Sequence, residues 1–186
     1  MPFNKTDIPG LVLFQPKVFE DSRGYFFESF NKAVFAAEGL AFDWVQDNES
    51  YSGYGVIRGL HFQNHPKAQA KLIRVLEGKI YDVAVDIREG SPTFGKWFGV
   101  ELSSENKLQL LIPKGFAHGF SVISETAKVL YKCDNLYDKN AEGGIMYNDA
   151  DLNIDWKIPA DKSIISDKDL HHPSLKDCNT QFIFEE

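Results

Sequence analysis

Short runs of alternating apolar and polar residues recur along most of the chain, and they are rich in β-branched and aromatic residues. Alternation of this kind is typical of strands that bury one face and expose the other. The runs span residues 11–19, 23–30, 54–63, 70–78, 79–87, 96–103, 107–112, 118–124 and 127–134. Many short strands at this spacing predict a β-sandwich or a β-barrel.

Turn-forming residues separate these runs. Glu77 and Gly78 lie between two apolar arms and predict a tight hairpin. The Ser91-Pro92 pair and residues 113–115 predict further turns, because proline and glycine favour turn geometry.

Helical signals are few. We expect one short helix over residues 32–38, because Asn31 is a good capping residue and Gly39 can end the helix. From about Asp149 the alternation weakens, and we expect loops and short helical turns that wrap over the sheet. The predicted fold is therefore all-β: a cupin-like jelly-roll barrel with short peripheral helices and a C-terminal wrap. An immunoglobulin-like sandwich is the alternative.

Length and composition favour one soluble domain over residues 1–186. Hydrophobic residues make up 43% and charged residues 25% of the chain, and no apolar run approaches the roughly 20 residues of a membrane span. The first ten residues carry no signal-peptide pattern, so we expect a cytoplasmic protein. Cys133 and Cys178 are far apart, which favours reduced structural thiols.

The formal net charge of −7 argues against binding to nucleic acid or to an anionic membrane. An anionic small molecule would need a local cluster of arginine and lysine residues.

His61 and Lys71 are the first candidates for chemistry, because each interrupts an apolar strand pattern. Strict alternation puts His61 on the same face as Gly59, whose missing side chain would leave room for a ligand, and puts Arg58 on the opposite face. If His61 and Lys71 both point into a barrel, burial favours their uncharged forms, which makes His61 a neutral base near pH 7. The alternatives are a half-exposed structural histidine and an exposed edge-strand lysine.

Other polar residues in aromatic-rich strands are weaker candidates. His118, Tyr131 and Tyr137 have the chemistry to hold or transfer protons, although a packed core position explains each equally well. No metal site is predicted, because His61 and His65 lie in a strand and turn, and the side chains of His171 and His172 would diverge. No nucleotide-cofactor motif is present either, so no cofactor is expected.

Seven stretches in order along the chain resemble the dTDP-4-dehydrorhamnose 3,5-epimerase family. They are residues 19–30, 45–50, 55–63, 68–97, 112–120, 131–138 and 165–169. The resemblance implies a metal-independent, cupin-like homodimer that inverts C3 and C5 of dTDP-4-dehydro-6-deoxy-D-glucose. It serves dTDP-L-rhamnose synthesis.

The resemblance also implies roles for individual residues. His61 matches the base, oriented by Asp169; Lys71 matches the partner of the enolate oxygen, and Tyr131 matches the proton donor. The residues that match substrate contacts are Arg23, Glu28, Gln46, Asn48, Arg58, His118, Tyr137, Glu142 and Lys168.

Two other functions stay open at this point. The same pocket residues would suit an epimerase that inverts only C3 or only C5 of a related dTDP-4-keto-6-deoxysugar. A non-catalytic sugar-nucleotide-binding cupin is the second alternative.

Overall fold

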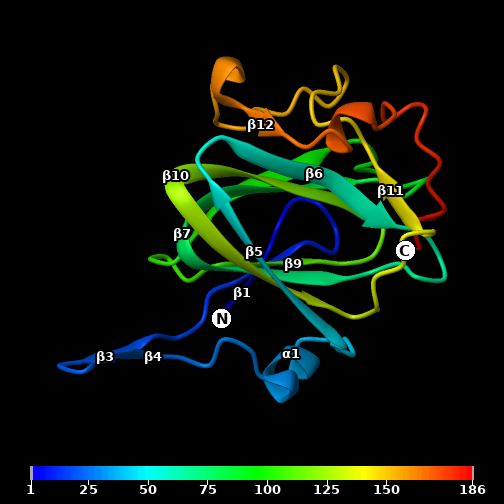
Figure 1. Ribbon diagram of the computed structural model, residues 1–186. Helices are drawn as coiled ribbons and strands as arrows, with labels where there is room; N and C mark the ends of the chain where they lie inside the picture. The colour runs from blue at the N-terminus through cyan, green and yellow to red at the C-terminus, as the bar shows by residue number, and fades with distance from the viewer. Residues whose placement is uncertain (1, 186) are drawn as a thin grey trace.

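One ten-stranded sheet, which curls into a barrel, dominates the computed structural model, which describes residues 2–185 (Figure 1). Its strands are β1 (Phe3–Lys5), β2 (Val12–Phe14), β5 (Gln46–Gly53), β6 (Val56–Gln63), β7 (Lys71–Asp86), β8 (Trp97–Ser103), β9 (Gln109–Ile112), β10 (Phe116–Cys133), β11 (Glu142–Gly144) and β12 (Ile164–Ile165). The other described elements are the hairpin β3 (Phe19–Asp21) and β4 (Gly24–Phe26), and the helices α1 (Lys32–Ala37), η1 (Ala160–Lys162) and η2 (Asp169–His171). The all-β prediction is confirmed.

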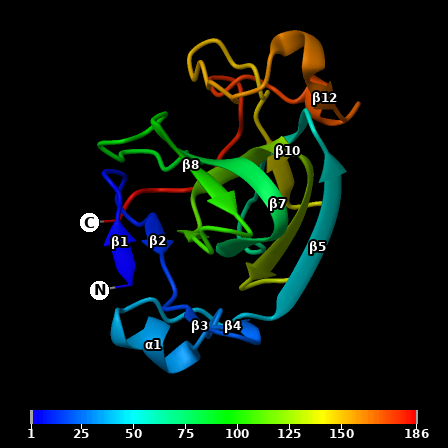
Figure 2. The same ribbon diagram turned by 90° about the vertical axis from the view of Figure 1, so that its left-hand side faces the viewer.

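Two long antiparallel strands, β7 and β10, pair along nearly their whole lengths and shape the barrel (Figures 1 and 2). The first half of β7 pairs with β9 and its second half with β8. The first half of β10 pairs with β6 and its second half with β5. Both strands therefore pass from one layer of the barrel into the other.

The predicted hairpin at Glu77 and Gly78 is wrong, because β7 continues through both residues. The strands predicted separately at 118–124 and 127–134 are likewise one strand. Gly78 has a φ of +74°, and a Cβ there would collide with the Thr126 carbonyl oxygen of β10. The glycine thus permits a bend where the two strands pass between layers, and a bend leaves the same sequence signal as a turn.

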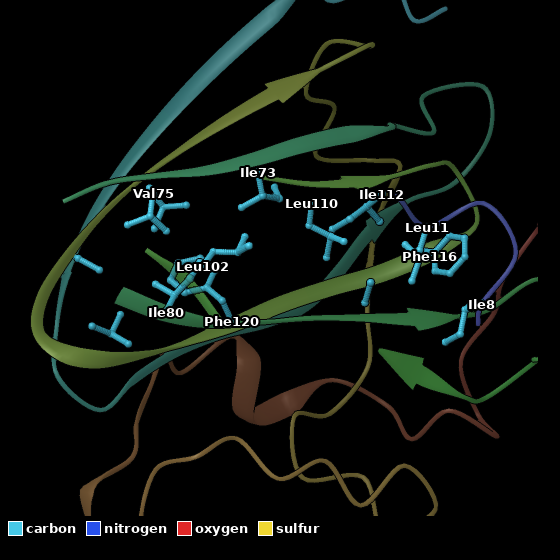
Figure 3. Close-up of a cluster of buried hydrophobic side chains, with 14 residues drawn as sticks. Ile8, Leu11, Ile73, Val75, Ile80, Leu102, Leu110, Ile112, Phe116 and Phe120 are labelled. Atoms are coloured by element: carbon cyan, nitrogen blue, oxygen red, sulfur yellow. The ribbon is translucent and has the colours of Figure 1, made fainter. Parts of the chain in front are cut away.

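Apolar side chains from both layers meet inside the barrel (Figure 3). Ile73 of β7, Leu110 of β9 and Phe120 of β10 are almost completely buried there. Burial of one such side chain contributes about 1.5–3 kcal/mol, so this cluster holds together the strands that carry the polar residues described below.

The predicted helix is confirmed as α1. The Asn31 Oδ1 atom accepts a hydrogen bond from the Ala33 backbone N–H at 3.0 Å, which caps the first turn. Gly39 follows the helix with a φ of +78°. Phe35 is buried against Phe14, so the helix packs on the side of the barrel formed by β2.

The C-terminal third crosses the outside of β6, as predicted (Figure 1, orange and red). β12 pairs with β6 in parallel, and Trp156 and Phe182 pack against the outer face of the sheet. This segment brings η2, and with it Asp169, to the edge of β6. No helix within residues 2–185 has the length and apolar character needed to cross a membrane.

The β3–β4 hairpin projects away from the barrel (Figure 1, lower left). It is a separate two-stranded sheet, and its aromatic residues are open to solvent: Phe19 is 54% and Phe26 is 69% exposed. An isolated hairpin is marginally stable in water, so a surface of this kind calls for a partner.

Candidate active site

A cavity of about 600 Å³ lies between the two layers of the barrel. Its size is that of an ordinary small-molecule site. The predicted site residues that line it are Asn48, Arg58, His61, Lys71, His118, Tyr131, Tyr137, Glu142, Lys168 and Asp169. The other three predicted residues, Arg23, Glu28 and Gln46, are not on its wall.

A β-bulge in β6 turns two of these residues toward the same cavity. His118 on β10 lies opposite His61. Phe120 lies opposite Arg58, so three steps along β6 match two steps along β10. The prediction that Arg58 and His61 lie on opposite faces is therefore wrong. Gly59 sits in the bulge with a φ of +138°, and a Cβ there would collide with the backbone of β10, so strand packing explains this glycine.

His61 and Asp169 form a hydrogen-bonded pair at the cavity wall. The His61 Nε2 atom lies 2.7 Å from Asp169 Oδ1, and the Gly59 N–H donates to Asp169 Oδ2 at 3.3 Å. The Asp169 side chain is 5% exposed, whereas that of His61 is 30% exposed. Burial alone would raise the pKa of Asp169, but the hydrogen bonds from His61 and Gly59 outweigh it and hold the pKa below its usual range. The carboxylate is therefore ionised and orients the imidazole.

Lys71 reaches the cavity from a different part of the sheet. We predicted that Lys71 and His61 share one polar site, and both line the same cavity, but their strands are not neighbours because β10 lies between β6 and β7. Burial lowers the pKa of the Lys71 ammonium, although the nearby Cys133 thiol and two carboxylates oppose this shift. The amine is thus a cation in a poorly solvated place, where its field acts strongly on a neighbouring charge.

Tyr131 enters the cavity from the second half of β10. Its Oη atom lies 2.6 Å from Ser50 Oγ on β5. Burial raises the pKa of Tyr131 to about 12, with the Ser50 hydrogen bond opposing the shift. The phenol therefore keeps its proton at neutral pH. Ser50 was not predicted as a site residue, because β5 is mostly polar and its sequence does not alternate as a strand.

A second buried histidine–carboxylate pair lies beside the first. The His118 Nε2 atom is 2.7 Å from Asp82 Oδ1, and both side chains are almost fully buried. Burial lowers the pKa of His118 even though the Asp82 carboxylate favours its charged form. Sequence reasoning missed Asp82, although a carboxylate in the apolar run 79–87 is the kind of signal that identifies a buried partner.

A polar network surrounds the rest of the wall. The Tyr137 hydroxyl donates to Glu142 at 3.1 Å, and the Lys168 ammonium pairs with the other Glu142 oxygen at 2.5 Å. Gln46 lies behind this wall, where it accepts a hydrogen bond from the Tyr137 backbone N–H and donates one to Asn48. Gln46 thus holds two cavity residues in place from behind.

Arg23 and Glu28 lie outside the cavity of their own chain. Arg23 is on the projecting β3–β4 hairpin, where it pairs with Asp21 and is 88% exposed in its side chain. Glu28 follows the hairpin and accepts a hydrogen bond from Asn31 at the start of α1.

Comparison with known proteins identifies the family. A sequence model described as dTDP-4-dehydrorhamnose 3,5-epimerase matches residues 5–177. The chain belongs to the dTDP-4-dehydrorhamnose 3,5-epimerase family. The enzyme of that name from Shigella flexneri is 53% identical over 94% of this chain and 96% of its own length.

Solved structures of such epimerases share the fold. The dTDP-4-dehydrorhamnose 3,5-epimerase from Elizabethkingia anophelis NUHP1 is 55% identical, with a TM-score of 0.90 over 94% of this chain and 96% of its own. The dTDP-6-deoxy-D-glucose-3,5-epimerase from Legionella pneumophila Philadelphia 1, in complex with dTDP-4-keto-L-rhamnose, is 47% identical with a TM-score of 0.90 over 94% of this chain and 92% of its own. The predicted family and its cupin-type jelly roll are confirmed.

Proposed function

We propose that this chain converts dTDP-4-dehydro-6-deoxy-D-glucose to dTDP-4-dehydro-L-rhamnose by inverting C3 and C5, a step of dTDP-L-rhamnose synthesis. The observation that carries the proposal is the shared cavity: a base held by a buried carboxylate, a protonated phenol and a poorly solvated ammonium all line it. Both carbons flank the C4 ketone, so removal of either proton gives an enolate that such groups stabilise and reprotonate.

His61 takes the proton. When its Nε2–H donates to Asp169, Nδ1 keeps the lone pair that a base needs. The fixed, ionised carboxylate also stabilises the imidazolium that forms. A positioned base of this kind contributes roughly 10²–10⁴ in rate.

Lys71 and Tyr131 complete the reaction. The Lys71 ammonium stabilises the enolate oxygen, a role whose removal typically costs ~10²–10³ in rate. Tyr131 returns a proton to the opposite face of the sugar, and a hydrogen bond donated by Ser50 would leave the phenol proton free for this transfer. A base and an acid on opposite faces give inversion rather than simple exchange.

The nucleotide part of the substrate meets the cationic groups near the cavity mouth. Arg58 and Lys168 line the wall and supply positive charge against a net charge of −7. Arg23 and Glu28 act on the cavity of a second copy, in a homodimer that covers the exposed aromatic face of the β3–β4 hairpin. His118 contacts the sugar, while Asn48, Tyr137 and Glu142 contact the nucleotide side.

Three wider expectations belong to the same proposal. The chain acts as a single domain over residues 1–186, works in the cytoplasm, and needs neither a metal nor a cofactor for turnover.

Proton NMR in D₂O tests the proposal directly. With dTDP-4-dehydro-6-deoxyglucose we expect deuterium at C3 and C5 together with inversion at both carbons. Inversion at one carbon alone would instead identify a 3-epimerase or 5-epimerase, and binding without label incorporation would identify a non-catalytic binder. His61→Ala is the matched variant, and we expect it to fold normally and to lose exchange at both carbons.

A further inference from the structure

His172 lies against the catalytic pair, although nothing in the proposed reaction uses it. Its ring is packed so closely on Gly144 of β11 that a Cβ on this glycine would overlap the ring. The ring centroid lies 5.6 Å from that of His61, with 73° between the planes. His171 points the other way, as predicted, because its ring is 73% exposed and bonds to the Asp167 carbonyl.

Both imidazoles face one carboxylate oxygen. The His172 Nε2 atom lies 3.5 Å from Asp169 Oδ1, and His61 Nε2 lies 2.7 Å from the same oxygen. One donor atom from each of the three residues lies within 4.8 Å of the others. Within residues 2–185, this is the group of histidine, cysteine and acidic side chains that has the spacing of a metal site.

His172 also leaves a donor atom unused. Its Nε2 is buried without a well-aligned hydrogen-bond partner, and the side chain is only 12% exposed. An orphaned imidazole nitrogen that faces an ionised carboxylate is half of a zinc site, and His61 supplies the other nitrogen.

We propose that His61, Asp169 and His172 form a three-ligand site for a divalent transition-metal ion such as Zn²⁺, and that the ion inhibits the enzyme. Two imidazoles and one carboxylate are ligands that zinc takes in proteins, at about 2.0–2.2 Å from each donor atom. The ion would replace the hydrogen bond between His61 and Asp169. Its remaining position would face the cavity.

Inhibition follows from the chemistry of the His61 ring. In the free enzyme the ring proton is on Nε2 and the lone pair of Nδ1 accepts the substrate proton. When a metal takes the Nε2 lone pair, the single ring proton moves to Nδ1, and no proton is gained or lost. Nδ1 then has no lone pair for the substrate, so the base is lost while the sugar pocket stays open.

This consequence for turnover rests on the proposed function, whereas metal binding itself does not. The charged neighbour that opposes a cation is Lys168, whose ammonium is paired with Glu142 at 2.5 Å. That ion pair keeps much of the positive charge of Lys168 away from the site.

Metal binding is measured first, without substrate, on the chelator-treated full-length protein. We expect one Co²⁺ or Zn²⁺ per chain by calorimetry, and for Co²⁺ a visible absorption band typical of nitrogen and oxygen ligands. In His172→Asn the affinity should fall at least about tenfold, a loss seen even when an outer partner of a metal ligand is removed. His171→Asn, the same change at the adjacent exposed residue, should bind metal like the unaltered protein.

Turnover with and without Zn²⁺ is then compared within each variant. We expect Zn²⁺ to lower kcat by ~10²–10⁴ at saturation with little change in KM, because the base is lost and the pocket is not. His172→Asn should resist this inhibition. If His172→Asn packs poorly by circular dichroism, His172→Phe keeps the ring against Gly144 without a ligand atom.

Three results would overturn the inference: no stoichiometric binding, equal affinity in the two asparagine variants, or inhibition that acts only through KM. A protein that binds metal at this site yet shows no epimerisation would refute the proposed function and leave the site standing.

Discussion

Replacing Tyr131 with phenylalanine separates proton removal from proton return. The change deletes one hydroxyl and keeps the ring, whose centroid lies 6.2 Å from Phe120 and 6.5 Å from His118. The Ser50 hydroxyl loses its partner 2.6 Å away, which costs about 0.5–1.5 kcal/mol of unfolding free energy. The variant should therefore remain folded, with its cavity shaped as before.

The kinetic effect should be much larger than the effect on stability. Loss of a positioned acid lowers the rate of product formation by ~10²–10⁴. His61 and Lys71 are untouched, so enolate formation continues and substrate hydrogen still exchanges with D₂O. The assay follows deuterium at C3 and C5 by NMR beside the appearance of inverted product.

Ser50→Ala is the control for this experiment, because it breaks the same hydrogen bond and keeps the phenol. We expect it to lose no more than about tenfold in product formation. If Tyr131→Phe loses exchange and product in parallel, the phenol acts before the enolate forms and its assignment as donor is refuted.

Three further changes test other parts of the site and fold. Lys71→Met should lower kcat by ~10²–10³, and because burial lowers the pKa of Lys71 below 10.5, unaltered enzyme should lose activity as pH rises through that lowered value. Arg23→Ala and His61→Ala should each be nearly inactive, but unfolding and refolding them together should restore activity if one chain completes the site of its partner; no recovery would contradict the shared site. Asp86→Asn should destabilise the protein by roughly 3–5 kcal/mol in denaturant titrations at pH 7, because it breaks a buried pair with Arg88. Arg88, with neighbouring hydroxyl groups, outweighs burial and holds the Asp86 pKa below 3.8, so this difference should shrink as acid protonates the carboxylate; a constant difference down to pH 2 would contradict the assignment.

The sequence predicted fold class better than strand continuity. Alternation identified most strands, and the cap at Asn31 located the helix, because both signals are local. It divided β7 at Gly78 because a left-handed glycine serves a turn and a bend equally well. It missed β5, since this strand is polar and owes its conformation to pairing with β10.

The candidate site shows the same division between local and long-range information. His61, Lys71 and Tyr131 stood out as polar residues within apolar runs. Their convergence depends on a bulge at Gly59 and on strand order, and neither is encoded in a residue pattern. His172 was passed over because a histidine in a loop has no pattern at all until Asp169 is placed beside it.

The bend in β10 explains how one small barrel presents both a base and an acid to a single sugar ring. His61 belongs to the layer that pairs with the first half of β10, and Tyr131 lies on the second half, in the layer with β5. A ligand between the layers is therefore flanked by the two groups from opposite sides. Proton removal from one face and return to the other, which inversion requires, then follow from the two-layer architecture, and movement of neither strand is needed.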